Sequence, residues 1–338
     1  MVGRGGAGKE QRLIQVVRAE WKQIALAPES SVLVGFSGGR DSTALLAALR
    51  PVVANLHALH VDHAVREESA GDAEHASVVA RRLGVPFTSK RLADDVAAMH
   101  PGVGLEEALR RERYLVFAEV SESVGAGIVA LGHHAQDQAE TVLLHLLRGS
   151  GLSGVVGMRS VSEIRVPWWG DVAPRSLRLW RPLLEVQPAE LDFFIAASGL
   201  PVVADLSNND RRFRRNAIRH DVLPLLDQIS PGAVGNLARF GALVGDEDAF
   251  LESLAVAALG DVELLARSTL AGLPRVIQRR MVRIWLRRHL GEIEVSRNRI
   301  DAVVLAASEQ RGPVTIEIGG GWDVQVDREF LSITVRLR

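Results

Sequence analysis

The sequence predicts an α/β protein in which a parallel sheet, covered by helices on both faces, is followed by a second, mainly helical domain. Short apolar runs alternate with helical spacing over the first 150 residues, a pattern typical of βαβ units. After about residue 225 the alternation gives way to long helical periodicity. The 338 residues are enough for two domains. We therefore expect a tail and the start of a helix over 1–20, a first domain over 21–228 and a second over 229–338.

Apolar periodicity and turn residues place the elements of the first domain. Residues 1–10 are Gly-rich and charged, and we expect a disordered tail. The apolar runs predict strands at 31–36, 55–63, 86–91 and 127–133. Helical spacing predicts helices at 11–27, 43–49, 71–84, 105–124 and 135–147. The loops that follow parallel strands meet at one edge of a sheet, so we expect the site at that edge.

The second domain is predicted from longer periodic segments. Helices are expected at 233–259, 274–290 and 296–308. Residues 313–336 alternate around three consecutive glycines, which predicts three short strands that end the chain.

The composition excludes several classes of protein. The sequence has no cysteine, which excludes disulfides, thiolate zinc sites and cysteine nucleophiles and fits a cytoplasmic location. No apolar run is long enough to cross a bilayer, and the amino terminus lacks the apolar segment of a signal peptide. We therefore expect no membrane association. The oligomeric state is left open, with a homodimer as one possibility.

Residues Ser37-Gly38-Gly39-Arg40-Asp41-Ser42 follow a predicted strand and open a predicted helix. Glycine lets the backbone approach an anion, and the free N–H groups of a helix start favour phosphate. The two serine hydroxyls add donors. An acid such as Asp41 makes sense in this loop if it holds Mg²⁺ bound to the phosphates. The alternative is a Gly-rich turn in which Asp41 only caps the helix.

This loop resembles the S-G-G-x-D-S signature of the N-type ATP pyrophosphatases, a PP-loop family with a Rossmann-like sheet. Four further segments resemble the tRNA(Ile)-lysidine synthetase branch of that family, in the expected order over roughly residues 30–225. They are His60-Val61-Asp62-His63-Ala64-Val65-Arg66, the helix from Leu105 through Arg113-Tyr114, Gly132-His133-His134-Ala135-Gln136-Asp137-Gln138-Ala139-Glu140-Thr141 with Arg148-Gly149-Ser150-Gly151-Leu152, and Asp205-Leu206-Ser207-Asn208 with Arg215-Asn216-Ala217-Ile218-Arg219. Gln136 departs from the family, which more often has aspartate there.

The resemblance implies a two-step reaction in a catalytic first domain. ATP adenylates the C2 oxygen of the wobble cytidine in the CAU anticodon of tRNA(Ile), and the amine of L-lysine then displaces AMP. The implied cofactor is Mg²⁺ at Asp41. The implied catalytic residues are Asp41, Asp137, Glu140, Arg113 and His133. Val61, Asp62 and His63 would border the adenine, and Arg110, Arg148, Arg215, Asn216 and Arg219 would contact substrate or tRNA.

Two carboxylates, Asp137 and Glu140, lie three residues apart near a helix start and hence on one face. They could bind metal, hold the lysine ammonium or accept its proton, or they could simply stabilise the helix start. A structural zinc site at the neighbouring histidines is not expected, because no fourth ligand is evident. We interpret His133 as a substrate or phosphate contact.

The second domain carries arginines at a spacing of four, Arg275, Arg279, Arg283 and Arg287, opposite an apolar stripe. This predicts an amphipathic helix whose basic face either contacts tRNA phosphates, through Arg279, Arg283 and Arg287, or is merely solvated.

Other functions remain as alternatives. A tRNA thiolase commonly needs cysteines, which are absent. GMP or argininosuccinate synthetase activity fits the post-strand segments less well. A catalytically inactive RNA-binding protein on the same fold is disfavoured by the presence of Ser37, Asp41, Asp137 and Glu140.

Overall fold

The computed structural model of the chain describes residues 6–27, 29–62, 69–169, 173–203, 214–291, 295–309 and 313–336. It divides into two compact units, Met1–Val244 and Gly245–Arg338, which we describe separately. The division falls within one helix, α11 (Ala233–Leu259).

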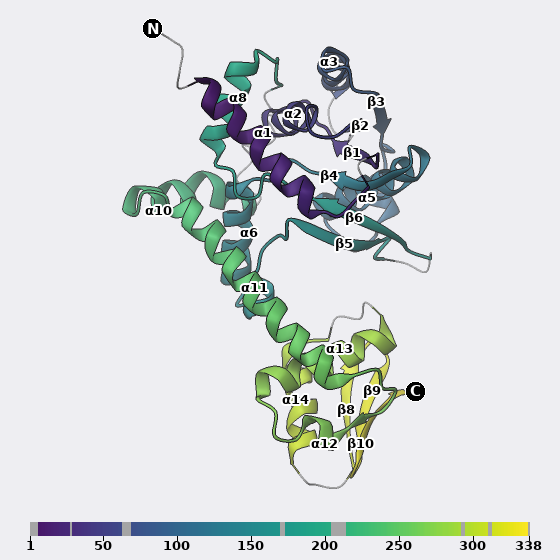
Figure 1. The fold of residues 1–338 in the computed structure, drawn as a ribbon. Helices are drawn as coiled ribbons and strands as arrows, with labels where there is room; N and C mark the ends of the chain where they lie inside the picture. Colours follow the sequence, from purple (N-terminus) through teal and green to yellow (C-terminus); the bar gives the residue numbers. More distant parts are fainter. Residues whose placement is uncertain are drawn as a thin grey trace. The chain divides into compact units, whose positions relative to one another are not determined.

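The first unit is built on a six-stranded sheet with strand order β3-β2-β1-β4-β6-β5 (Figure 1). Strands β1 to β4 and β6 run parallel, and β5 pairs antiparallel to β6 at the edge. The strands are β1 (Ser31–Gly35), β2 (Asn55–Asp62), β3 (Phe87–Arg91), β4 (Ala126–Ala130), β5 (Val161–Val166) and β6 (Arg175–Trp180). The chain leaves β1 toward β2 and later returns to β4 on its other side, so the loops after β1 and β4 lie at a topological switch point.

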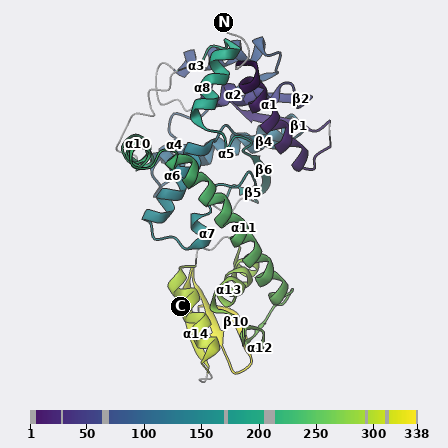
Figure 2. The same ribbon diagram turned by 60° about the vertical axis from the view of Figure 1, so that its left-hand side comes forward.

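Helices cover both faces of this sheet, because successive residues of a buried strand point to opposite sides. Val32 and Val34 pack in a core with α1, α2, α3 and α8, whereas Leu33 packs with α5 on the other face (Figure 2). The helices of this unit are α1 (Gly6–Gln23), α2 (Arg40–Leu49), α3 (Ser69–Arg82), α4 (Val96–Met99), α5 (Leu105–Ser123), α6 (Ala135–Leu147), α7 (Leu152–Val155), α8 (Pro188–Ser198), α9 (Arg214–Ala217), the π-helical η2 (Ile218–Val222) and α10 (Leu223–Ile229).

The expected parallel sheet with flanking helices is confirmed, with local differences. Helix α1 begins at Gly6, so the expectation of a tail through residue 10 was wrong for residues 6–10. Strand β4 ends at Ala130, which places His133 in the following loop rather than in a strand. The hairpin of β5 and β6 was not predicted, because its strands alternate charged and apolar residues like an exposed surface segment.

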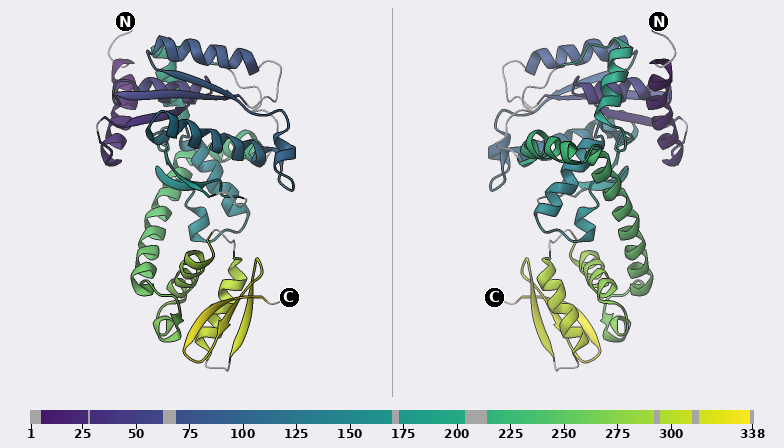
Figure 3. Two further views of the ribbon diagram at one scale, coloured as in Figure 1. Left: turned by 90° about the vertical axis from the view of Figure 1, so that its right-hand side faces the viewer. Right: turned by 90° about the vertical axis from the view of Figure 1, so that its left-hand side faces the viewer.

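The second unit places helices beside a small antiparallel sheet of order β7-β10-β9-β8, as Figure 3 shows for α14 and the strands drawn in yellow. Its elements after α11 are β7 (Leu265–Ala266), α12 (Arg267–Leu270), α13 (Arg275–Leu290), α14 (Arg297–Ser308), β8 (Val314–Gly319), β9 (Trp322–Val326) and β10 (Phe330–Val335). The apolar side of α13 fills the core, with Met281 and Trp285 fully buried. The three predicted terminal strands are confirmed. Within the described residues, no helix is long and apolar enough to cross a membrane.

Candidate active site

The loop between β1 and α2 has the form of an anion cradle. Gly38 adopts a φ of +80°, which side chains rarely tolerate. The Ser37 and Ser42 hydroxyls lie 3.1 Å apart, and Ser42 Oγ also accepts the Ser37 backbone N–H at 3.2 Å. Gly39 is the N-cap of α2 and offers no side chain to cap the helix. The first N–H groups of α2 therefore have no side-chain cap and can meet an anion.

The loop after β4 packs directly on this cradle. A Cβ added at Gly132 would lie 3.1 Å from the Asp41 carbonyl carbon and oxygen and 3.2 Å from the Ser42 nitrogen. Only glycine permits so close an approach without a shift of the backbone. Two loops that are 90 residues apart in the sequence are thereby held together at the switch point between β1 and β4.

His134 links the two loops. It is the N-cap of α6, and its Nδ1 accepts the Gln136 backbone N–H at 3.2 Å. This bond assigns the ring proton to Nε2. That atom lies 3.5 Å from Asp41 Oδ2 and 3.6 Å from Asp137 Oδ2. His134 is thus positioned as a bridge between the carboxylate of the phosphate loop and the carboxylate of α6.

Asp41 is held in its charged form. Burial opposes ionisation, but the hydrogen bond and charge of His134, and then those of Arg40, outweigh it and lower the pKa of Asp41 to about 2. Arg40 Nε donates to Asp41 Oδ1 at 2.6 Å, and Arg40 Nη1 donates to Asp192 Oδ1 at 2.9 Å. Asp41 therefore carries a full negative charge beside the phosphate loop at any physiological pH.

Asp137 and Glu140 are paired with two arginines that follow 75 residues later. Arg219 donates to Glu140 Oε1 at 2.5 Å and to Asp137 Oδ1 at 2.8 Å, and Arg215 donates to Glu140 Oε2 at 2.7 Å. Arg219 lies in η2, a π-helical turn of the kind often found at functional sites. We call Asp41, His134, Asp137, Glu140, Arg215 and Arg219 the acid–arginine network.

A second group, which we call the cation pocket, consists of two arginines, Arg113 and Arg181, and of His133. Each has a buried nitrogen without a hydrogen-bond partner: Arg113 Nε, His133 Nδ1 and Arg181 Nε. Burial lowers the pKa of both arginines, and it lowers the pKa of His133 to about 3. Among the charges that act on His133, Asp137 favours the protonated ring, whereas Arg181, Arg215 and Arg113 oppose it, so both arginines of the group lie near His133.

The carboxylates of the site can hold Mg²⁺ only if a bound ligand supplies further oxygen atoms. No group of three or more acidic or histidine side chains in the described part of the chain could hold a metal. Mg²⁺, however, is commonly bound by one or two carboxylates together with substrate phosphates and water. Asp41 beside the phosphate loop, with Asp137 across His134, fits that arrangement.

Comparisons with known proteins agree with this geometry. Residues 10–226 match the PP-loop domain model, and residues 265–331 match the TilS substrate binding domain model. A tRNA(Ile)-lysidine synthase of Gloeobacter violaceus is 34% identical over 91% of this chain and 92% of its own length. The chain belongs to the tRNA(Ile)-lysidine synthase family.

Other members of the tRNA(Ile)-lysidine synthase family are longer. That of Pseudomonas syringae is 38% identical over 78% of this chain but only 55% of its own length. The chain spans between 48% and 59% of three of the curated relatives it matches. A U34-tRNA thiolase from Methanococcus maripaludis shares the fold, with a TM-score of 0.53 at 18% identity over 70% of this chain and 79% of its own.

Several residues expected at the site lie beside the groups described above. Arg110 stacks 5.4 Å from the ring centroids of both Tyr114 and Trp168, with half of its side chain exposed. Val61 and Asp62 end β2, where Asp62 is buried. His63 lies outside the described residues. Arg148 is the exposed C-cap of α6, and Asn216 lies on α9 between the two arginines of the network.

Two of the three predicted tRNA-contacting arginines of the second unit already have acidic partners. Arg283 donates to Glu252 at 2.7 Å, and Arg279 donates to Asp301. Arg287 is exposed, with no side-chain partner recorded among the described residues. The basic face of α13 is therefore largely neutralised within its own unit.

Sequence reasoning missed three residues of this site. His134 was part of a recognised segment, and the spacing of His134 and Asp137 is that of a capping box, which is the signal that could have singled it out. Arg181 follows an unpredicted strand, and Asp192 lies on a helix, α8, for which no expectation was formed. Neither carries a local signal of its role.

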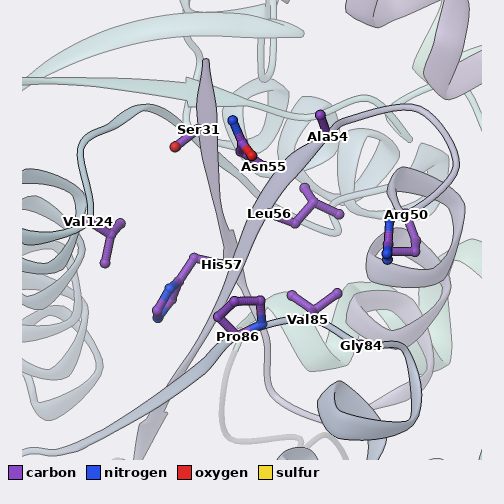
Figure 4. Close-up of a pocket in the computed structure, with 10 residues that line it drawn as sticks. All are labelled: Ser31, Arg50, Ala54, Asn55, Leu56, His57, Gly84, Val85, Pro86 and Val124. Atoms are coloured by element: carbon purple, nitrogen blue, oxygen red, sulfur yellow. The ribbon is translucent and has the colours of Figure 1, made fainter. Parts of the chain in front are cut away.

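A cleft of about 300 Å³ lies at the other edge of the sheet, among the first residues of β1 and β2 (Figure 4). Ser31, Asn55 and His57 line it. It contains none of the residues expected at the site, and β1 separates it from the phosphate loop.

Proposed function

We propose that the chain is a tRNA(Ile)-lysidine synthase, which joins L-lysine to C2 of the wobble cytidine in the CAU anticodon of tRNA(Ile) at the expense of ATP. AMP and pyrophosphate are released, and the anticodon then reads AUA instead of AUG. The observation that carries this proposal is the continuous path from the phosphate loop through Asp41, His134 and Asp137 to Arg219 and Glu140. It joins three of the sequence segments that resemble the family.

The phosphate loop is proposed to bind the pyrophosphate part of ATP through Ser37, Gly38, Gly39, Ser42 and the first N–H groups of α2. Asp41 would hold Mg²⁺, which neutralises charge that builds on the leaving pyrophosphate. Arg40 lies beside Asp41 and can turn toward the phosphates, because its second partner, Asp192, is mostly exposed. Val61, Asp62 and His63 are proposed to border the adenine.

The two carboxylates of α6 are proposed to have different roles. Glu140 is fully buried, and both of its oxygens accept hydrogen bonds from arginine. It therefore positions Arg215 and Arg219, which are proposed to face the substrate together with Asn216. Asp137 keeps 12% of its side chain exposed and is the carboxylate proposed to meet the lysine amine. An amine that attacks carbon must lose a proton, and a neighbouring carboxylate can accept it.

The remaining assignments concern RNA and assembly. Arg113 and His133 are proposed to contact the substrate nucleotide, and Arg110 and Arg148 to contact tRNA near the site. In the second unit we propose tRNA contacts for Arg287 foremost, and for Arg279 and Arg283 once their acidic partners release them. A cytoplasmic location and a homodimeric assembly complete the proposal.

Lysine transfer tests the proposal directly. Radiolabelled lysine, ATP and Mg²⁺ are incubated with a CAU-anticodon tRNA(Ile) transcript, with a methionine tRNA as the matched control and Asp41→Ala as the inactive variant. Label on the isoleucine tRNA alone, lost in Asp41→Ala, is expected. RNA binding without label would instead favour a non-catalytic RNA-binding protein.

A further inference from the structure

Within the described residues, none of the three side chains of the cation pocket forms a recorded salt bridge, although the charge of Glu106 acts on Arg113 and that of Asp137 acts on His133. Arg113 donates no recorded hydrogen bond to the described residues; its one recorded contact is the Tyr114 ring, 5.7 Å from its guanidinium carbon. Arg181 donates from Nη1 to the Arg159 carbonyl and the Ser162 hydroxyl, both at 2.9 Å, and neither acceptor is charged. A buried charge without an opposite charge is costly, so proteins seldom keep one unless a ligand completes it.

The pocket faces away from the phosphate loop. His134 is in an extended conformation, with φ −132° and ψ −174°, and consecutive side chains of an extended segment point to opposite sides. The His134 side chain points to Asp41 of the phosphate loop. His133 therefore points to the other side, where Arg113 and Arg181 lie. The carboxylate of Asp137 lies near both histidines.

Three structural elements contribute to the pocket. Arg113 comes from α5, His133 from the loop after β4, and Arg181 from the residue that follows β6. His133 and Arg181 follow the carboxyl ends of β4 and β6, the edge of a parallel sheet where ligands bind. Arginine pairs and imidazole N–H groups are the donors that phosphate oxygens accept best.

We propose that Arg113, His133 and Arg181 form a second anion site, which binds a phosphate group separately from the phosphate loop. Of the three residues, only Arg181 has no role in the function proposed above. The anion site itself is argued from these three side chains. The choice of the molecule that carries the phosphate rests on the proposed function. A phosphodiester of the RNA beside the modified cytidine fits best, because the phosphates of ATP already have a loop of their own.

Binding measurements distinguish the two sources. Arg113→Met and Arg181→Gln are compared with Arg175→Gln, which removes an exposed arginine at the other end of β6. Affinities are measured for ATP by equilibrium dialysis and for a CAU anticodon stem-loop by fluorescence anisotropy. Loss of one charge-assisted contact is expected to weaken RNA binding about 10- to 100-fold in both pocket variants, with ATP binding unchanged. Weakened ATP binding with RNA binding intact would instead assign the pocket to a nucleotide phosphate.

A chemical substitution in the RNA sharpens the first outcome. A methylphosphonate at the phosphodiester flanking the wobble cytidine removes one charge. If the pocket binds that group, the methylphosphonate and Arg181→Gln together weaken binding no more than either does alone.

Inorganic phosphate provides a test that does not depend on the identity of the RNA. Phosphate is expected to raise the Tm of the wild type and to raise that of Arg113→Met less. Without ligand, Arg113→Met is expected to be as stable as the wild type or more so, because it removes a buried charge that has no recorded salt bridge among the described residues. If neither variant changes its response to phosphate, ATP or RNA, the second anion site is refuted.

Discussion

The acid–arginine network and the cation pocket each contain one of two consecutive histidines, His134 and His133, and they differ in how their charges are balanced. In the network, each carboxylate of α6 accepts hydrogen bonds from an arginine or a backbone N–H. In the pocket, three buried nitrogens have no hydrogen-bond partner among the described residues. A satisfied network holds its side chains in place before the substrate arrives, whereas an unsatisfied group of cations gains its stabilisation only when an anion binds. The first region is thus a scaffold and the second a receptor.

The largest effect is expected from breaking the scaffold at Glu140. Glu140→Ala leaves Arg215 and Arg219 without their buried partner, which should lower the free energy of unfolding by about 3–5 kcal/mol. Urea denaturation measures this change. Glu122→Ala, which removes an exposed partner of Arg175, should cost less than about 1 kcal/mol. Similar losses in the two variants would show that the buried ion pairs of Glu140 stabilise the fold no more than an exposed one does.

Asp41→Asn should separate the catalytic part of the network from its structural part. We expect the single-turnover rate of AMP formation to fall about 100- to 1000-fold, because the charge that would hold Mg²⁺ is lost. Stability should change little, since more than a third of the Asp41 side chain is exposed. Rapid-quench measurement of AMP release, with the exposed Asp94→Asn as control, checks this. A loss of stability without a loss of rate would place Asp41 in the scaffold alone.

The pocket should impose a pH dependence of its own. Burial keeps the pKa of His133 near 3, below the value of about 6.5 expected in the unfolded chain. The folded state then binds fewer protons between these values, so stability is fully present above about pH 6.5 and falls as the pH is lowered. The loss reaches at most about 2 kcal/mol at pH 5.

Denaturation curves of the wild type and His133→Asn at pH 8 and pH 5 measure that difference. The variant should lose less stability on acidification. Saturating phosphate should also reduce the loss in the wild type, because a bound anion favours protonated imidazole. Parallel pH profiles for the two proteins would show that His133 is not held neutral.

The smallest effects are expected on α13. Arg287→Gln removes an exposed arginine with no recorded partner and should reduce the slope of log affinity against log salt for tRNA by about one. Arg283→Gln removes an arginine that already pairs with Glu252 and should change that slope less. Filter-binding titrations at several salt concentrations compare the two. A larger change for Arg283→Gln would mean that its acidic partner yields to RNA.

Some features of the site could be predicted from the sequence, and others could not. The strand–loop–helix context of Ser37 to Ser42 predicted the phosphate loop, because glycine and helix-start chemistry are local. The pairing of Asp137 and Glu140 on one helix face was equally local. Their partners were not. The sequence predicted substrate or tRNA contacts for Arg215 and Arg219 but gave no sign that these arginines pair with the two carboxylates. On α13, the four-residue spacing of arginines predicted RNA contacts. The sequence did not show that Arg279 and Arg283 have acidic partners within their own unit.

The sequence by itself determined the order of strands and helices, the phosphate loop, and the residue types available for ATP and RNA chemistry. These follow from periodicity, turn residues and motifs within a few positions of one another. Only the tertiary structure decided which charges meet. It brought Gly132 against Asp41, set His133 and His134 on opposite sides of one loop, and placed Arg113 and Arg181 near His133. The reason is that ion pairing and burial depend on distances between elements far apart in the chain, and no local pattern encodes those distances.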